Sequence, residues 1–430
     1  MLLITLFFYI SIIIWLCLSG SRSIAIVLVL IWWGSWNTLS YLSISGLFVL
    51  SFNTQCMYFL FFSLFSFSYI AHERIFESNF AGDSNLTNNN DFYSILLWIS
   101  ICFVLPVQLF FASHTVYILK YIMPPATYRN DVFGLLTGSA TVFFNSNTVA
   151  LLHSLVIGPF QYILLFSGLA FYILRKRYGL LLIGVVLVIL DSLIMFGRFG
   201  YHYLLISVLL GLVFITYFNG FSKLRSNLLK ASLPIFLLLF LTLWITFYRG
   251  SKSVLDIFDL FVVTYHTESF SIFDVELKNP SSILYQYSYG LSMLGGIERY
   301  WVLVLNKLGI GYLSQTDIVG GYLHQDFDIG VDRFGKPIQL NAYGSIFFTM
   351  YRDGGVFGVI FFAAIFGFLF SYFSVSLKNR DPYRFSLLIG LMFILIYGIF
   401  QPTTLGPMLP ALFFLVVMKF FIQVYNRVRF

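Results

Sequence analysis

Charged residues are scarce in this chain. They make up 10% of its 430 residues, whereas hydrophobic residues make up 59% and the mean hydropathy is +0.88. A soluble globular domain carries about 25% charged residues, so the composition excludes that class. It favours an all-α polytopic membrane protein with roughly 11 or 12 spanning helices of about 20 apolar residues each.

Cysteine is also rare, and several familiar sites are missing. The three cysteines, Cys17, Cys56 and Cys102, all lie in apolar runs, which favours packed thiols over disulfides or a metal site. The sequence has no Gly-rich phosphate loop, zinc-type Cys/His cluster or nucleotide-binding unit, so we expect neither a metal nor a cofactor. The net charge of +7 lies mainly in short loops, where it sets membrane orientation, and does not indicate a nucleic-acid partner.

Apolar runs long enough to cross a bilayer occur along most of the chain. The first has no basic residue before it, unlike a signal peptide, so we expect it to be retained as a helix. We predict eleven spans, at about 1–19, 23–41, 54–72, 92–113, 152–174, 179–197, 200–219, 231–248, 355–377, 385–402 and 409–425.

Basic clusters indicate the orientation of these spans. They lie at 175–177, 223–230, 378–384 and 427–429, all on one side, which the positive-inside rule makes cytoplasmic. Segment 114–151 leaves an alternative open, because an outside position gives eleven spans and a crossing gives twelve. The acidic charge of 72–91 favours twelve, but the many Ser, Thr and Asn residues of 114–151 favour eleven, which we prefer.

One long stretch, 249–354, is too polar to lie in lipid. It holds eleven of the chain's 18 acidic residues. A large loop on a rigid membrane scaffold usually carries chemistry or recognition. We therefore divide the chain into a helix bundle over 1–248, a large external loop over 249–354, and C-terminal helices over 355–430. Within the loop, the apolar spacing of 299–313 predicts an amphipathic helix at the membrane surface.

Charges within spans are costly, so each needs a reason. Asp191 and Arg198 are two helical turns apart and are expected to share a face, with His202 one turn further if the helix continues. A guanidinium at the outer end of a span, backed by a carboxylate, suits bidentate binding of a diphosphate. The alternative is an arginine that snorkels to the interface beside a structural partner.

Two further arginines are candidates for the same role. Arg249 follows Tyr248 at the outer end of a span, where orientation requires no basic residue, so it is either a second anion ligand or an interfacial anchor. Arg129 lies outside if the chain has eleven spans and is an ordinary cytoplasmic charge if it has twelve.

Segment 320–337 concentrates His324, Asp326, Asp328 and Asp332. These residues could supply a general base for a sugar hydroxyl, for which the intrinsic pKa favours His324. They could equally bind a cation or form a solvated turn.

The most informative stretch is 341–373, NAYGSIFFTMYRDGGVFGVIFFAAIFGFLFSYF. Arg352 and Asp353 lie at the entry to a glycine-punctuated span, where a lipid headgroup would lie. The alternative is that they only mark the start of the helix. Glycines on a spanning helix permit close helix packing. In this stretch the chain resembles the O-antigen (Wzy-type) polymerases, also described as oligosaccharide repeat-unit polymerases. The shared pattern is an Asn-aromatic start at Asn341, the acidic Asp353 before Gly-x-x-Gly, and a Gly-rich span, with Gly-Arg at 197–198 and Tyr-Arg at 248–249 as secondary likenesses.

The resemblance implies a membrane glycosyltransferase of the GT-C class in the bacterial inner membrane, with its active site facing the periplasm. It would move a growing glycan from one undecaprenyl diphosphate carrier onto the non-reducing end of another lipid-linked repeat unit, with a chain-length regulator as a further partner. The resemblance gives the following residues roles: Arg198, Arg249, Arg352 and Arg129 as diphosphate ligands, His324 or Asp353 as the base, and Asp191, His202, Asn341 and Tyr248 as supporting residues.

Two rival functions stay open. A ligase would transfer finished glycan to a lipid core, and a flippase would move the lipid-linked unit without chemistry. A flippase should carry charges across several helices and show internal repeats. Charge inside the predicted spans is nearly limited to Asp191, and no repeat is visible. A purely structural membrane protein is disfavoured by the outward-facing arginines.

Overall fold

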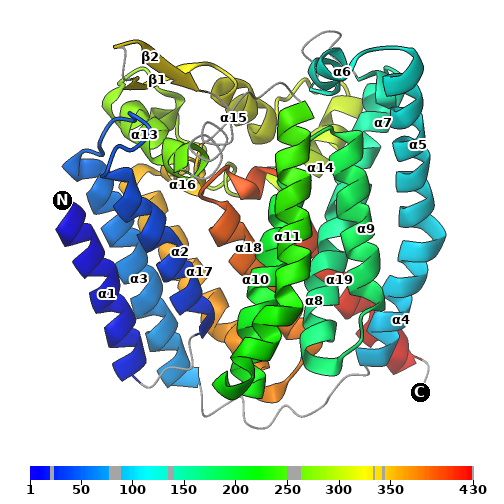
Figure 1. The fold of residues 1–430 in the computed structure, drawn as a ribbon, viewed down its shortest axis with the longest axis horizontal. Helices are drawn as coiled ribbons and strands as arrows, with labels where there is room; N and C mark the ends of the chain where they lie inside the picture. Colours follow the sequence, from blue (N-terminus) through cyan, green and yellow to red (C-terminus); the bar gives the residue numbers. More distant parts are fainter. Residues whose placement is uncertain are drawn as a thin grey trace. The chain divides into compact units, whose positions relative to one another are not determined.

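The computed structural model describes residues 1–19, 24–76, 89–133, 140–248, 263–332, 335–340 and 344–428. These residues form helices almost throughout, with one two-stranded hairpin (Figure 1). Packing divides the chain into two compact units. The first comprises Met1–Asn85, Phe258–Arg380 and Leu387–Pro410, and the second comprises Leu86–Ile257, Asp381–Ser386 and Ala411–Phe430. The three-part division predicted above follows sequence order, whereas packing groups most of the polar loop with the first three helices.

Apolar helices overlap every predicted span. Within the part of the chain that the structure describes, six are long and apolar enough to cross a membrane: Phe52–Ile75, Asn90–Tyr121, Asn147–Arg175, Phe199–Asn219, Phe221–Trp244 and Gly355–Asn379. Shorter apolar helices cover Leu2–Leu18, Ile24–Ser40, Gly179–Ile194, Pro382–Tyr397 and Met408–Val424. In lipid each helix satisfies its own backbone hydrogen bonds, which explains why apolar runs of this length become helices. The chain is therefore an all-α membrane protein.

The first unit is built around closely packed helices. Its apolar helices are α1 (Leu2–Leu18), α2 (Ile24–Ser40), α3 (Phe52–Phe76), α17 (Gly355–Asn379) and most of α18 (Pro382–Tyr397). Gly367 of α17 lies against α3, where an added Cβ would come within 2.4 Å of the Phe65 carbonyl oxygen. The predicted close packing of the glycine-punctuated span is thus confirmed. Trp33 connects α2 to α18 by donating a hydrogen bond of 2.8 Å from Nε1 to the Leu395 carbonyl.

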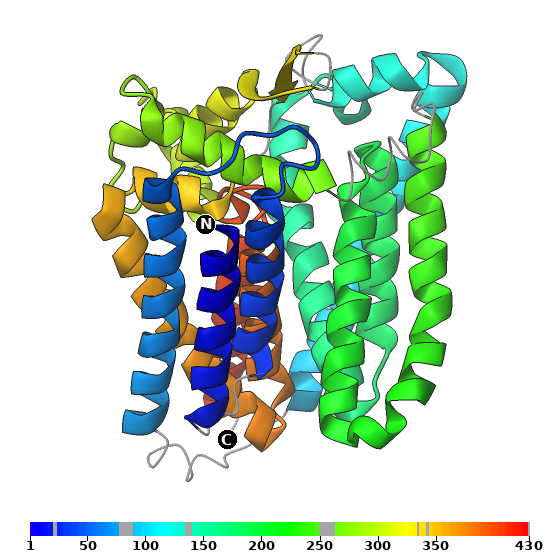
Figure 2. The same ribbon diagram turned by 60° about the vertical axis from the view of Figure 1, so that its left-hand side comes forward.

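A set of short elements covers one end of this unit. We call the described residues 263–353 the polar cap. Figure 2 shows α13 of this cap lying across the ends of α1, α2 and α3. The cap contains α13 (Tyr265–Lys278), η7 (Ile283–Tyr285), α14 (Gly295–Lys307), α15 (Gln315–Leu323), β1 (Phe327–Val331), β2 (Pro337–Leu340) and α16 (Ile346–Arg352).

Two contacts fasten the polar cap to the connection between α2 and α3. The Asp274 carboxylate of α13 accepts hydrogen bonds from the Ser51 backbone N–H (3.0 Å) and from Thr54 Oγ1 (2.5 Å). The Phe48 backbone N–H donates to the Ile329 carbonyl of β1 at 2.8 Å. These bonds satisfy backbone groups that leave regular structure at the end of a span.

Two details of the polar cap differ from the prediction. The amphipathic helix begins at Gly295 and ends at Lys307, because residues after Leu308 turn back and Gly309 adopts a left-handed φ of 83°. Its exposed residues include the apolar Trp301 and Val304 as well as Asn306 and Lys307 near its end. The hairpin β1–β2 was not predicted, because its acidic residues obscure the alternating pattern of a strand.

The second unit consists of helices joined by short turns. It holds α4 (Asn89–Ile99), η2 (Ser100–Val104), α5 (Leu105–Tyr121), α6 (Pro125–Val132), η3 (Thr141–Phe143), α7 (Asn147–Leu152), η4 (His153–Ile157), α8 (Gly158–Arg175), α9 (Gly179–Ile194), α10 (Phe199–Asn219), η5 (Phe221–Lys223) and α11 (Leu224–Tyr248). The η2 and η4 turns are π-helical and continue the helices on both sides. In the first unit, η8 (Thr403–Leu405) precedes α19 (Met408–Val428), most of which lies in the second unit.

The predicted continuous helix through Asp191 and Arg198 is wrong. Helix α9 ends at Ile194, Phe196 adopts a left-handed φ of 48°, and Arg198 is the residue immediately before α10. Asp191 and Arg198 therefore do not share a face of one helix. Gly197 lies in the break and Gly200 in the first turn of α10. Glycine disfavours a continuous helix here, because it loses more conformational freedom in a helix than other residues do.

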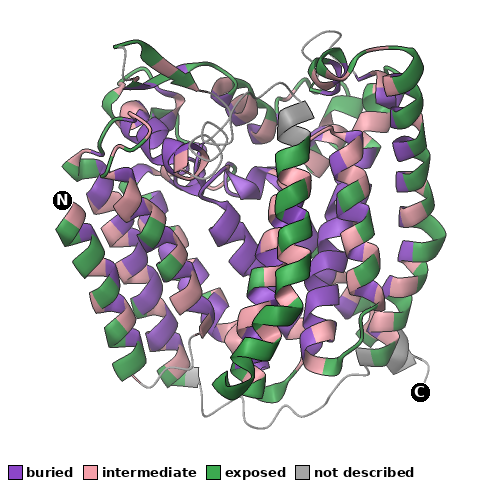
Figure 3. Ribbon diagram, in the orientation of Figure 1, coloured by how far each residue is buried: buried purple, intermediate pink, exposed green. Residues whose placement is uncertain are grey.

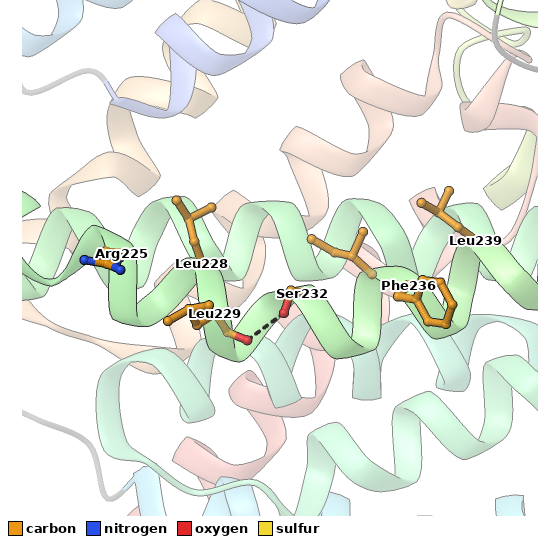
Figure 4. A pocket seen from close by; sticks show the side chains of 7 residues that line it. Arg225, Leu228, Leu229, Ser232, Phe236 and Leu239 are labelled. Atoms are coloured by element: carbon orange, nitrogen blue, oxygen red, sulfur yellow. Dashed lines mark hydrogen bonds between the residues drawn. The ribbon is translucent and has the colours of Figure 1, made fainter.

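The outer side of α11 is largely exposed, whereas α18 is buried over most of its length (Figure 3). A shallow apolar cavity of about 530 Å³ lies on α11, and Figure 4 shows the side chains that line it. Every residue that lines it belongs to this one helix: Arg225, Leu228, Leu229, Ser232, Ile235, Phe236 and Leu239. Such a surface suits contact with lipid chains, and it presents no convergent polar groups of the kind that a catalytic site needs.

We predict that Gly367→Ala destabilises the protein by about 1–3 kcal/mol, because the new methyl group forces α17 away from α3. Gly311→Ala is the matched control, since an added Cβ there meets no atom within 4 Å. Thermal unfolding in detergent measures both variants. Equal unfolding midpoints for the two would contradict the packing described here.

Candidate functional site

Asp353 lies at the break between α16 and α17 and holds a loop in place. Its carboxylate accepts hydrogen bonds from Ser288 Oγ (2.5 Å) and from the backbone N–H groups of Ser292 (2.9 Å) and Met293 (2.8 Å). We call residues 286–294 the anchored loop. Asp353 is only 6% exposed, and a buried carboxylate requires several donors of this kind. These contacts give Asp353, a predicted base, a clear role in positioning the loop.

The turn after Asp353 requires glycine. Gly355 has a left-handed φ of 60°, and a Cβ there would lie 2.9 Å from the Tyr287 hydroxyl. Any other residue would therefore combine backbone strain with a collision against the anchored loop. The Gly-Gly pair in the motif thus sets the path of the backbone from Arg352 and Asp353 into α17.

Arg352 is buried with part of its hydrogen-bonding capacity unused. Its side chain is 4% exposed, and Nε donates to the Gln286 carbonyl at 3.4 Å. Nη1 is buried and has no hydrogen-bond partner. Burial lowers the pKa of Arg352, while nearby Asp353 and Glu298 raise it. A guanidinium stays charged in proteins, so Arg352 presents an open donor that an anionic or hydroxyl oxygen could fill.

Glu298, in the first turn of α14, lies near this guanidinium and is 8% exposed. Its two oxygens accept hydrogen bonds from the Gln315 backbone N–H (2.7 Å) and from the Tyr312 hydroxyl (3.1 Å). Burial raises the pKa of Glu298, and nearby Asp317 adds to this, whereas the two hydrogen bonds and Arg352 lower it. Burial has the largest effect, so the carboxyl group titrates above its usual range.

Gln315 adds a second unused polar atom, because its Oε1 is buried without a partner. We call Arg352, Asp353, Glu298, Tyr312 and Gln315 the Arg352–Glu298 cluster. The sequence prediction included Arg352 and Asp353 and missed the other three. Glu298 was visible only as one of many acidic residues in the loop, and no local pattern indicates that it meets Arg352.

His324 and the acidic residues around it lie elsewhere in the polar cap. His324 is exposed and forms a 2.6 Å hydrogen bond from Nδ1 to the Gly320 carbonyl. Asp328 accepts a hydrogen bond from Gln339 Nε2 (2.8 Å), and Asp332 accepts one from the Lys336 backbone N–H (2.8 Å). These bonds stabilise the β1–β2 hairpin. Among the residues that the structure describes, no three His, Cys, Asp or Glu side chains form a group that could hold a metal ion.

In the second unit, the segments that carry Arg129 and Arg198 lie at the same end. The Tyr128 hydroxyl donates a 2.6 Å hydrogen bond to the Ile194 carbonyl, and the Tyr128 and Phe196 rings are 6.2 Å apart. Arg129 is half-buried, with its guanidinium 5.6 Å from the centre of the Phe133 ring. Arg198 is also half-buried and has His202 as an electrostatic neighbour. Packing thus brings two predicted diphosphate ligands to one end of this unit.

The same unit holds a polar group that the sequence prediction found only in part. Asp191 lies beside His153, Gln161 and Gln108. His153 and Gln108 form a hydrogen bond of 3.2 Å between Nε2 and Oε1. We call these four residues the intramembrane cluster. They come from three different helical segments and from the π-helical turn η4, so no single stretch of sequence reveals their association.

The side chains of three further predicted residues are not described. Arg249 and Asn341 lie outside the described residues, and for Tyr248 only the backbone is described.

We predict that Asp353→Ala releases the anchored loop, because it leaves two buried backbone N–H groups unpaired at a cost of about 1–3 kcal/mol each. Limited proteolysis of the purified protein should then cut within 286–294. Asp328→Ala, which removes an exposed carboxylate from the same polar cap, is the control and should leave this region protected. Protection of the loop in both variants would refute the anchoring role.

Comparison of the chain with protein-family models, with curated proteins and with solved structures found no match. The resemblance to the repeat-unit polymerases therefore rests on the 341–373 stretch and on the secondary likenesses at 197–198 and 248–249, and it stays a prediction.

Proposed function

We propose that this protein polymerises lipid-linked oligosaccharide repeat units. As a GT-C-type glycosyltransferase, it would transfer the growing glycan from one polyprenyl diphosphate carrier onto the non-reducing end of another lipid-linked unit. The proposal combines the sequence resemblance with the chemistry of the Arg352–Glu298 cluster.

One observation carries most of the argument. Arg352 is a buried cation at the base of a polar cap, and its Nη1 has no partner. When the glycosidic bond to a lipid diphosphate breaks, negative charge develops on the departing oxygen. A preorganised guanidinium stabilises that charge most strongly in a site from which water is excluded. The open donor of Arg352 meets this requirement without a metal or a nucleotide.

The proposed orientation follows from the apolar helices and the basic clusters. We propose that the six long and the five shorter apolar helices are the eleven spans predicted above. The described residues between α5 and α7 form only the short α6 and η3, which supports an outside position for this segment. The polar cap, Arg198 and Arg129 would then face the periplasm of a bacterial inner membrane, where lipid-linked units become available after transport.

A flippase is the second candidate, and the intramembrane cluster favours it. Half-buried Asp191 and buried His153, Gln108 and Gln161 place more polarity within the apolar helices than the sequence indicated. Ionisable residues within spans often mark transport pathways. A ligase shares the expected chemistry with the polymerase and differs in its acceptor.

Surface polysaccharide from a strain that lacks this protein distinguishes the three functions. If the protein is a polymerase, a single repeat unit should still be attached to the lipid core, because export and ligation continue. Loss of every attached unit would indicate a ligase, and carrier-linked units trapped on the inner face would indicate a flippase. Gel electrophoresis of the polysaccharide measures how many repeat units are attached to the lipid core. Glycan labelling of intact cells measures whether carrier-linked units are trapped on the inner face.

We further predict that Arg352→Lys abolishes long-chain polymer, because a lysine cannot reproduce the planar donor geometry of the guanidinium. Arg198→Ala and Arg249→Ala should act in the same direction if these residues also hold diphosphate. Arg299→Lys is the control, since Arg299 is a partly exposed arginine of the same polar cap, 3.9 Å from Asp317. Immunoblots of membranes check insertion, and normal chain lengths from Arg352→Lys would refute the role of Arg352.

A further inference from the structure

Glu298 has an environment that the anchoring carboxylates of the polar cap lack. Asp353 accepts three hydrogen bonds, and Asp274 accepts several and pairs with Lys278 at 2.5 Å. Among the described residues, each oxygen of Glu298 accepts one hydrogen bond, from Tyr312 or from Gln315. A carboxylate oxygen has two lone pairs, so Glu298 can still accept hydrogen bonds from a ligand.

The unused atoms around Glu298 are complementary to a pair of hydroxyl groups. Arg352 Nη1 offers donors, and Gln315 Oε1 offers an acceptor, and both atoms are buried without partners. Leaving such atoms unpaired costs free energy, which a ligand with matching groups recovers. A sugar with neighbouring hydroxyls both donates and accepts, and it therefore matches this set better than a purely anionic ligand does.

We propose that Glu298 is the general base that activates the acceptor sugar of the polymerisation reaction. This inference rests on the proposed function. The attacking hydroxyl donates its hydrogen bond to Glu298, while a neighbouring hydroxyl of the same sugar donates to Gln315 Oε1. Nη1 of Arg352 carries two N–H bonds, so it can contact the diphosphate oxygen and an acceptor oxygen together.

The reaction balances with these groups alone. The hydroxyl oxygen forms a bond to the anomeric carbon of the growing glycan, and the bond between that carbon and the diphosphate oxygen breaks. The bonding electron pair leaves with the diphosphate, whose new charge faces Arg352. The proton of the hydroxyl passes to the Glu298 carboxylate and later to solvent beside Tyr312, which is only partly buried.

Burial makes the Glu298 carboxylate a stronger base than an exposed one, because it raises the pKa of this group. The charged or titratable groups that face it are Tyr312, Asp317 and Arg352. Burial raises the Glu298 pKa above its usual value, and a base is most effective when its pKa approaches the working pH. Because only the ionised form accepts a proton, the rate should fall as the pH decreases through this raised pKa.

Glu298→Gln tests the proposal against a closely matched control. Glu276→Gln makes the same change at another buried carboxylate of the polar cap, which accepts from Ser282 Oγ and the Tyr322 hydroxyl, both at 2.5 Å. The substrate is the pool of carrier-linked repeat units extracted from a strain that lacks this protein. Glu298→Gln should lower the polymerisation rate about 10²- to 10⁴-fold, as expected for loss of a general base. Glu276→Gln should retain most of the rate.

Tyr312→Phe supplies a second test if Glu298→Gln does not fold. It keeps the base but removes a hydrogen bond that stabilises the ionised carboxylate, so the acid limb of the pH–rate profile should move to higher pH. An unchanged acid limb in Tyr312→Phe, or a normal rate in Glu298→Gln, would overturn the role of Glu298. Failure of the unmodified protein to extend the units would instead overturn the proposed function.

Discussion

The contact between the Asp353 carboxylate and the anchored loop determines most of the candidate site. A loop that leaves helical structure exposes backbone N–H groups, and once buried these groups need acceptors. Asp353 supplies the acceptor for Ser292 and Met293, immediately before α14 begins at Gly295. The first turn of α14 carries Glu298, so the same contact that closes the break between α16 and α17 also brings Glu298 to Arg352.

Burying these charged groups together costs free energy, and packing alone does not explain why they are present. Replacing buried charged groups with apolar residues often leaves a protein as stable or makes it more stable. The Arg352–Glu298 cluster nevertheless keeps a guanidinium and two carboxyl groups, and it leaves Nη1 and Gln315 Oε1 unpaired. Unpaired buried atoms of this kind are expected where a ligand completes the hydrogen bonding. The cluster is therefore better explained by binding than by stability.

The sequence allowed a good prediction of the helices and a partial prediction of the site. The spans and the polar loop could be predicted segment by segment, because a segment that crosses lipid must be apolar and must satisfy its own backbone hydrogen bonds. The break before Arg198 was missed because an apolar run continues through Phe196, although Gly197 lies in the break. Glu298 and the intramembrane cluster were missed because tertiary packing joins residues that are far apart in the chain.

The two polar clusters differ in the ligands that they can bind. The Arg352–Glu298 cluster joins an open guanidinium donor to carboxyl groups, and so it can hold an anionic leaving group and accept a proton. The intramembrane cluster combines a carboxyl, an imidazole and two amides, which suits exchange of hydrogen bonds with protons or hydroxyls better than retention of a phosphate. The proposed bond cleavage at a lipid diphosphate is therefore assigned to Arg352, and the intramembrane cluster needs an explanation of its own within the apolar helices.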